Sequence, residues 1–163
     1  TRSGSVTGVQ TCALPICRME NARRTPFVGK AGIELNKLLE FIEIDVYEIF
    51  LTNVIKYWPQ TKFKTRSPTE DEIRVSRDYL MKEIDIVDPD IVGLCGGSAI
   101  RCIFPLIRQV KAQHGKLIDN KYVPLYHPAT ILYEGEMESM VQMGYLLMKS
   151  YLDNKEERAA NHG

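Results

Sequence analysis

The feature that most constrains the fold of this chain is an alternation of short apolar runs with segments of helical character. Residues 47–51, 91–95 and 121–126 contain β-branched and aromatic side chains and predict three strands. Helical periodicity and helix-start signals predict helices at residues 30–43, 69–85, 96–104 and 136–152. This alternation predicts an α/β domain of three layers, α/β/α, built on a short, mostly parallel central sheet.

The composition is that of a single soluble globular domain. The 163 residues include 44% hydrophobic and 26% charged side chains, and no apolar run approaches the ~18 residues that a membrane span needs. Lys and Arg total 21, as do Asp and Glu, so the net charge of zero gives no overall attraction to nucleic acid. Basic side chains gather in residues 56–66 and 101–121. They can line phosphates there, although solvated helix and loop faces explain them equally well.

The first seventeen residues differ in character from the rest of the chain. They have weak periodicity, many small side chains and no charge after Arg2, and they resemble the translated read-through of a sequencing adapter. We therefore expect residues 1–17 to be non-native, residues 18–152 to form the functional domain and residues 153–163 to be a polar, frayed tail. The first strand of the sheet is then expected to be missing or replaced. The alternative is a natural strand at residues 9–16.

Polar or glycine-rich segments follow the three predicted strands. Asn53 comes after the first of them, Gly96-Gly97 after the second, and His127 after the third. Ligands of parallel α/β sheets bind beyond the carboxyl ends of the strands. These segments are therefore expected to converge on one edge of the sheet.

Three short motifs resemble one known enzyme family. They are Pro-Phe-Val-Gly-Lys-Ala-Gly at residues 26–32, Thr-Asn-Val-Ile-Lys at residues 52–56 and Tyr-His-Pro-Ala at residues 126–129. In this order they resemble the uracil-DNA glycosylase superfamily, most closely its family four. The resemblance implies a bacterial base-excision repair enzyme, a cytoplasmic monomer, that flips uracil out of nucleoid DNA and hydrolyses its N-glycosidic bond.

The resemblance assigns roles to three side chains. Phe27 stacks on the flipped base, Asn53 pairs its amide with the adjacent N–H and carbonyl of uracil, and His127 donates to the uracil O2 as the base departs. From the residues alone each has a plainer interpretation: Phe27 as a plug on the core, Asn53 as a turn or cap residue, and His127 as a structural histidine. The other histidines, His114 and His162, keep the plainer interpretation.

Contacts with DNA are expected around these side chains. A helix that opens with glycines can hold a phosphate on its free N–H groups, although tight strand-to-helix packing explains the glycines equally well. Residues 128–132, which follow His127, resemble a wedge that enters the minor groove, or else form a turn into the last helix. The expected contacts are Lys30, Lys56, Lys64, Arg66, Gly96, Gly97 and Ser98 for phosphates, and Pro128, Ala129 and Thr130 for the wedge.

Two features depart from the family pattern. The leading motif, Gly-Glu-Ala-Pro-Gly or similar, is absent from its place before Glu20, so the group that activates water is expected to be lost and catalysis impaired. Two of the four cysteines that usually hold an iron–sulfur cluster would fall near Tyr57 and Ser76, which cannot ligate iron as thiolates do. Cys12 and Cys17 have the wrong spacing, so no cluster, other cofactor or metal is expected.

Two other functions stay open from the sequence. The same fold can serve as a catalytically inactive module that binds uracil or bent DNA. An unrelated α/β nucleotide-binding protein is the third hypothesis, although the sequence contains no Gly-x-Gly-x-x-Gly motif and no Walker loop.

Overall fold

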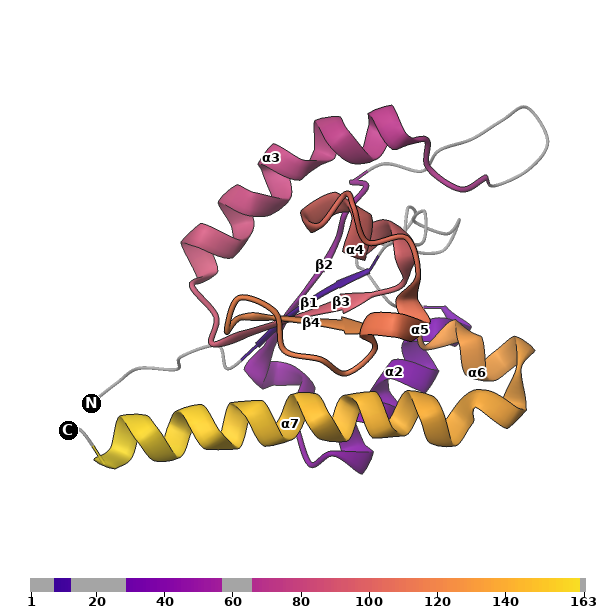
Figure 1. Cartoon of the computed structure of the whole chain (residues 1–163). Helices are drawn as coiled ribbons and strands as arrows, with labels where there is room; N and C mark the ends of the chain where they lie inside the picture. The colour runs from indigo at the N-terminus through magenta and orange to yellow at the C-terminus, as the bar shows by residue number, and fades with distance from the viewer. Residues whose placement is uncertain (1–7, 13–28, 57–65, 162–163) are drawn as a thin grey trace.

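A parallel sheet forms the centre of the molecule. The computed structural model describes residues 8–12, 29–56 and 66–161. Within them four parallel strands lie in the order β2-β1-β3-β4, where β1 is Gly8–Cys12, β2 is Ile49–Asn53, β3 is Ile91–Cys95 and β4 is Tyr122–Leu125 (Figure 1). Cys12 pairs with both Asn53 and Cys95, and Cys95 pairs with Leu125. The carboxyl ends of the four strands are therefore level with one another.

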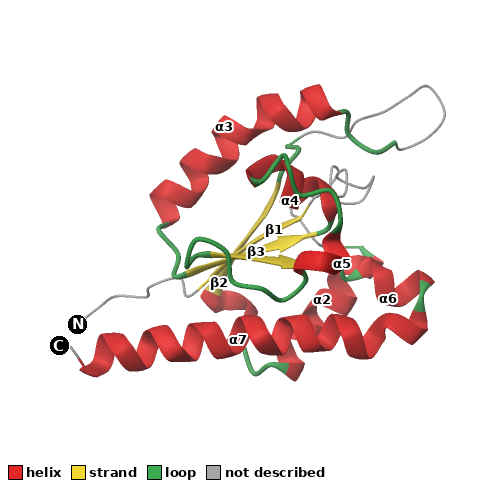
Figure 2. Ribbon diagram, viewed as in Figure 1, coloured by secondary structure: helices red, strands yellow, loops and turns green. Residues whose placement is uncertain are grey.

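Helices cover both faces of this sheet. The helices α2 (Lys30–Phe41) and α7 (Glu138–Asn161) pack on one face, and α3 (Glu70–Val87) and α4 (Gly97–Ile103) pack on the other (Figure 2). Side-chain direction reverses at each residue of a strand, so each strand feeds two cores. In β3, Ile91 and Cys95 pack with α2 and α7, whereas Val92 and Leu94 pack with α3 and α4. The predicted three-layer α/β/α architecture is confirmed.

The strand β1 lies in the segment that was expected to be non-native. It pairs with β2 on one side and β3 on the other, in the interior of the sheet. This agrees with the alternative expectation of a strand at residues 9–16. A strand thus occupies the place where the first strand of the sheet was expected to be missing or replaced. That residues 1–17 are non-native stays a prediction.

The strand β2 begins two residues later than the apolar pattern indicated. The carboxylate of Asp45 accepts a hydrogen bond from the N–H of Tyr47 at 3.0 Å and starts a short 3₁₀ turn, Val46–Glu48. Tyr47 is consequently 92% exposed, although it was expected to be part of the strand. The shift brings Thr52 and Asn53 into the sheet as its last residues on this strand.

The helix α3 starts at the predicted capping box. Thr69 Oγ1 accepts a hydrogen bond from the N–H of Glu72, and Glu72 Oε2 accepts one from the N–H of Thr69 at 2.7 Å. These two bonds satisfy N–H groups that have no partner within the helix. Such a local signal fixes the register of α3 against the sheet.

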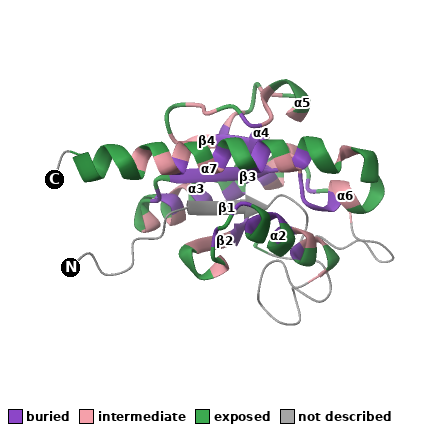
Figure 3. Cartoon of the chain, turned by 90° about the horizontal axis from the view of Figure 1, so that it is seen from below, coloured by how far each residue is buried: buried purple, intermediate pink, exposed green. Residues whose placement is uncertain are grey.

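The last helix is longer than the sequence pattern predicted. We expected a frayed tail from residue 153, but α7 continues to Asn161 as an exposed helix (Figure 3). Lys155 Nζ donates to the carbonyl oxygens of Asp90, at 2.8 Å, and Asn120, at 2.7 Å. Residues with high helix propensity also fill this polar segment, so the end of the amphipathic pattern does not end the helix.

Short elements connect the layers at the carboxyl end of the sheet. They are the helices α5 (Val110–Gln113) and α6 (Ala129–Tyr133) and the 3₁₀ turn η2 (Gly135–Met137). Across the described ranges, none of the helices has the length and apolar character that a membrane crossing requires.

Candidate active site

His127 follows β4 and is held in one protonation state. Its ring is 9% exposed, and burial lowers its pKa to about 4, so it is neutral near pH 7. Its Nδ1 accepts a hydrogen bond from the N–H of Ala129 at 3.0 Å. The proton of the neutral ring therefore sits on Nε2. His127 can thus act as a neutral N–H donor, and not as an acid that gives up a proton from an imidazolium.

Gly96 packs against the ring of His127. Its N–H donates to the carbonyl of Leu125 at 2.8 Å, which ties the end of β3 to the end of β4. Its φ of +89° is one that side chains disfavour, and a Cβ there would lie 3.4 Å from Cβ of His127. The geometry of Gly96 thus favours the tight-packing interpretation, since this glycine lets the turn after β3 approach the histidine.

The start of α4 is occupied by a side chain of the same helix. Arg101 Nη2 donates to Ser98 Oγ at 3.4 Å, and a Cβ on Gly97 would lie 3.0 Å from Arg101 Nη1. Arg101 Nε also lies 3.0 Å from Glu70 Oε1, though not aligned for a hydrogen bond. Arg101 begins the basic segment, residues 101–121, that the sequence analysis gave as able to line phosphates, and it supplies positive charge beside Gly97 and Ser98.

Asn53 ends β2 at the same edge of the sheet. It is 7% exposed, and its side-chain amide makes no hydrogen bond within the described parts of the chain. In the strand alternation Asn53 shares its face with Leu51, which packs with α2 and α7, whereas Thr52 points to the α3 side. An amide placed there has donor and acceptor capacity for a ligand.

The sheet sets the distance between these two polar groups. Asn53 ends β2 and is level with Leu125, the last residue of β4, so three strand spacings, about 14 Å, separate the backbones of Asn53 and Leu125, and His127 lies two residues further on. His127 continues the alternation of Val123 and Leu125, which pack on the same face as Leu51. The residues that carry these two groups therefore lie at the same edge of the sheet, beyond the ends of β1 and β3. The expected convergence of three segments on one edge of the sheet is confirmed.

The residues predicted to contact phosphates differ in their surroundings in the structure. Lys64 lies outside the described residues, as does Phe27, which was predicted to stack on the base, and Lys30 is the exposed first residue of α2. Lys56 is paired with Glu83 at 2.5 Å. Arg66 makes a two-pronged pair with Glu72, with both bonds at 2.7 Å, and this pairing lowers the pKa of Glu72 to about 2.

The residues predicted to form a wedge are mostly covered. Pro128 and Ala129 are buried and Thr130 is half-buried, because α6 packs them against the body of the protein. The side chains exposed on α6 are Leu132, the last residue of the predicted wedge segment, and Tyr133, which is 83% exposed. Any wedge at this position would therefore present the end of α6 and not its beginning.

The described cysteines do not suit an iron–sulfur cluster. Burial raises the pKa of the Cys95 thiol to about 12 and that of Cys102 to about 11, so neither forms a thiolate readily. Cys95 Sγ contacts Tyr145 Oη at 3.4 Å, and Ser76, where a family ligand was expected, is buried in α3. Among described residues no group of three metal-ligating side chains occurs. The absence of a cluster stays a prediction, and Tyr57 lies outside the described residues.

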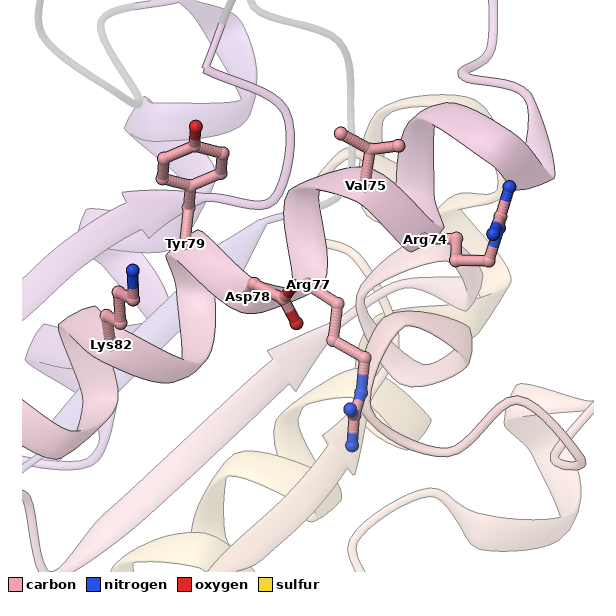
Figure 4. A pocket seen from close by; sticks show the side chains of 6 residues that line it. All are labelled: Arg74, Val75, Arg77, Asp78, Tyr79 and Lys82. Atoms are coloured by element: carbon pink, nitrogen blue, oxygen red, sulfur yellow. The ribbon is translucent and has the colours of Figure 1, made fainter.

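A hollow in the protein surface lies on the outer side of α3, away from the candidate site. Figure 4 shows that its side chains come from this single helix, with Val75 and Tyr79 on one side and Arg77 on the other. None of them lies at the carboxyl ends of the strands. The hollow therefore lies apart from the strand ends, where ligands of parallel sheets bind, and the edge that carries Asn53 and His127 remains the candidate site. The hollow on α3 is lined by Arg74, Val75, Arg77, Asp78, Tyr79 and Lys82.

Known proteins resemble this chain over most of its length. The type-4 uracil-DNA glycosylase of Archaeoglobus fulgidus is 31% identical over 133 residues, which are 74% of this chain and 64% of the relative. That of Sulfurisphaera tokodaii is 30% identical over 135 residues, 76% of this chain and 60% of the relative. A DNA polymerase of Bacillus phage SP01 is 31% identical over 140 residues, 83% of this chain but 15% of the polymerase.

The similarity includes the segments that build the candidate site. This chain spans 64% and 60% of the lengths of the two glycosylases. Residues 14–145 match the sequence profile of the uracil DNA glycosylase superfamily, a range that contains both Asn53 and His127. The chain therefore belongs to the uracil DNA glycosylase superfamily.

Proposed function

We propose that this protein is a DNA-repair glycosylase of the family-four type, which removes uracil from DNA by hydrolysing its N-glycosidic bond. The type-4 glycosylases that resemble it support this proposal. The observation that carries it is the buried, neutral His127, which keeps its proton on Nε2 at the edge of the sheet.

The chemistry requires a donor for the departing base. When the bond between the sugar C1′ and uracil N1 breaks, both bonding electrons leave with the base, and its O2 becomes negatively charged. The Nε2–H of His127 stabilises this charge by donating a hydrogen bond, and water then adds to C1′. A fixed donor of this kind lowers the barrier by about 3 kcal/mol. Because the ring is already neutral, no proton needs to be lost before it acts.

Recognition of the base is assigned to Asn53, at the end of the site opposite to His127. The Asn53 amide can donate to O4 and accept from N3–H of uracil, whereas cytosine presents a donor at position 4 and no hydrogen at N3. Phe27 is proposed to stack on the flipped base. Lys30, Lys64, Gly97, Ser98 and Thr130 are proposed as contacts to the DNA around it.

Several finer properties belong to the proposal. The protein is proposed to act as a monomer on DNA in the cytoplasm, to flip the base out of the duplex, and to need neither a metal nor an iron–sulfur cluster. A bacterial origin also stays a prediction, because most of the related glycosylases are archaeal. The group that activates water is proposed to be missing with the Gly-Glu-Ala-Pro-Gly motif, so hydrolysis is expected to be slow.

Base release from short oligonucleotides tests the proposed function. We expect the protein in excess to release uracil, and not cytosine, from otherwise identical single strands. Asn53→Asp is expected to lose uracil release, because a carboxylate can only accept hydrogen bonds. Equal release of uracil and cytosine would refute the proposed recognition. Uracil-selective binding with no release would refute the enzyme and support the inactive binding module.

A further inference from the structure

One carboxylate on α3 holds the chain on both sides of Asn53. Glu83 Oε2 accepts a hydrogen bond from Thr52 Oγ1 at 2.8 Å and another from Lys56 Nζ at 2.5 Å. Lys56 Nζ also donates to Thr52 Oγ1 at 2.5 Å. The three side chains form a closed ring, which we call the Glu83 ring. Residues 52 and 56 are thereby tied to the same oxygen atom, and Asn53 lies between them.

The Glu83 ring restricts the backbone from which Asn53 projects. Thr52 is 6% exposed, and its hydroxyl both donates and accepts within the ring, so its rotamer is fixed. Val54 and Ile55 are fully buried in the core beneath α3. The side chains of Thr52 and Asn53 point to opposite faces of the sheet. The ring therefore holds this segment on the face of the sheet opposite to the Asn53 amide. It does not use the hydrogen-bonding groups of that amide.

The position of Asn53 makes such a grip necessary. It ends β2, which among the described residues has a neighbouring strand on one side alone. Its amide makes no hydrogen bond of its own within the described ranges, so the orientation of the amide depends on the backbone. A group that reads a base must be held close to its productive geometry, and a displacement of about 1 Å can cost a hundredfold in rate.

We propose that Glu83 is a positioning residue that orients Asn53 for reading the base, acting through Thr52 and Lys56. This inference rests on the proposed function of the site. It also changes the role of Lys56, which was expected to contact a phosphate. Its ammonium group is engaged by Glu83 and Thr52, so it belongs to the ring that holds Asn53.

Two variants and one control test this assignment. Glu83→Gln removes the charge that attracts Lys56, and Lys56→Gln removes the other end of the pair. Asp71→Asn is the matched control, because Asp71 lies on the same helix and pairs with Arg74 in an exposed position. The first readout is the side-chain amide signal of Asn53 in nitrogen-15 NMR. It is expected to shift or broaden in both ring variants and to stay unchanged in the control.

Kinetics separate positioning from general stability. Glu83→Gln is expected to lower kcat/KM for uracil release by roughly tenfold to a hundredfold. In a protein that already carries Asn53→Ala, the same change is expected to have no further effect, because there is no amide left to orient. Lys56→Gln is expected to behave like Glu83→Gln without weakening binding to DNA that lacks uracil, which the loss of a phosphate contact would weaken.

The outcomes distinguish this inference from the function on which it rests. An equal loss of rate in the presence and absence of Asn53 would overturn the positioning role, as would an unchanged Asn53 signal in both ring variants. Complete lack of uracil release by the unaltered protein would refute the proposed function. The NMR comparison would then still decide whether Glu83 orients Asn53.

Discussion

Replacing His127 by glutamine is expected to remove a pH dependence of stability that the buried imidazole creates. The pKa of His127 is lowered from 6.5 to about 4, because burial disfavours the charged ring. As pH falls below 6.5 the unfolded chain takes up a proton that the folded protein refuses, so the free energy of unfolding decreases. At pH values above 6.5 neither state binds the proton, and His127 then contributes no pH dependence.

The size of this effect follows from the shift. A change from 6.5 to about 4 corresponds to a loss of roughly 3 kcal/mol once the pH is below both values. At about pH 4.5 the loss is already about 2.5 kcal/mol. Glu72 does not interfere strongly above this pH, since its pKa is lowered from 4.5 to about 2 and its contribution is lost below 4.5. The window between about pH 7 and about pH 4.5 therefore isolates the histidines.

Urea unfolding across this window measures the effect. The unaltered protein is expected to lose about 2.5 kcal/mol more than His127→Gln between the two ends of the window. Burial also lowers the pKa of His114, so that histidine contributes a pH dependence of the same sign. His114→Gln, measured in parallel, separates its contribution from that of His127. If His127→Gln and the unaltered protein have the same pH dependence, His127 is not held neutral, and the argument that it acts as an Nε2–H donor is refuted.

Two further predictions concern the packing around the site. Gly144→Ala is expected to destabilise the protein by about 1–3 kcal/mol in urea unfolding, because the new Cβ would lie 2.2 Å from Cε1 of His114; unchanged stability would contradict the contact. Cys95 and Cys102 are expected to resist alkylation in the folded protein near neutral pH, since burial raises both thiol pKa values. Peptide mapping after treatment with iodoacetamide measures this, and rapid labelling of either residue would show that it is accessible as a thiolate.

Local signals in the sequence predicted much of the fold. The capping box of Thr69 and Glu72 lies within four residues and fixes the start of α3, so the pattern alone was sufficient. The buried strand β3 was recognisable because all five of its residues are apolar or small. In contrast, the end of α7 was misjudged, since the bonds from Lys155 to Asp90 and Asn120 join residues far apart in sequence.

The site shows the same division between local and distant contacts. Asn53 and His127 were found because each follows a strand, and the level ends of parallel strands bring such residues to one edge. The bond between Thr52 and Glu83 spans 31 positions, and it forms because α3 packs over the end of β2. No spacing rule in the sequence reveals that contact. Gly96 was noticed as a possible phosphate contact, whereas its approach to His127 became visible once β3 and β4 were placed side by side.

Single-turnover release of uracil from a single-stranded oligonucleotide is the most direct test of the account. The unaltered protein and His127→Ala are compared at the same pH, with the protein in excess so that slow hydrolysis is still measured. We expect slow but uracil-specific release, reduced by roughly a hundredfold or more in His127→Ala while the fold is retained. Equal rates in the two proteins, or no release by either, would contradict the assignment of His127 as the group that stabilises the departing base.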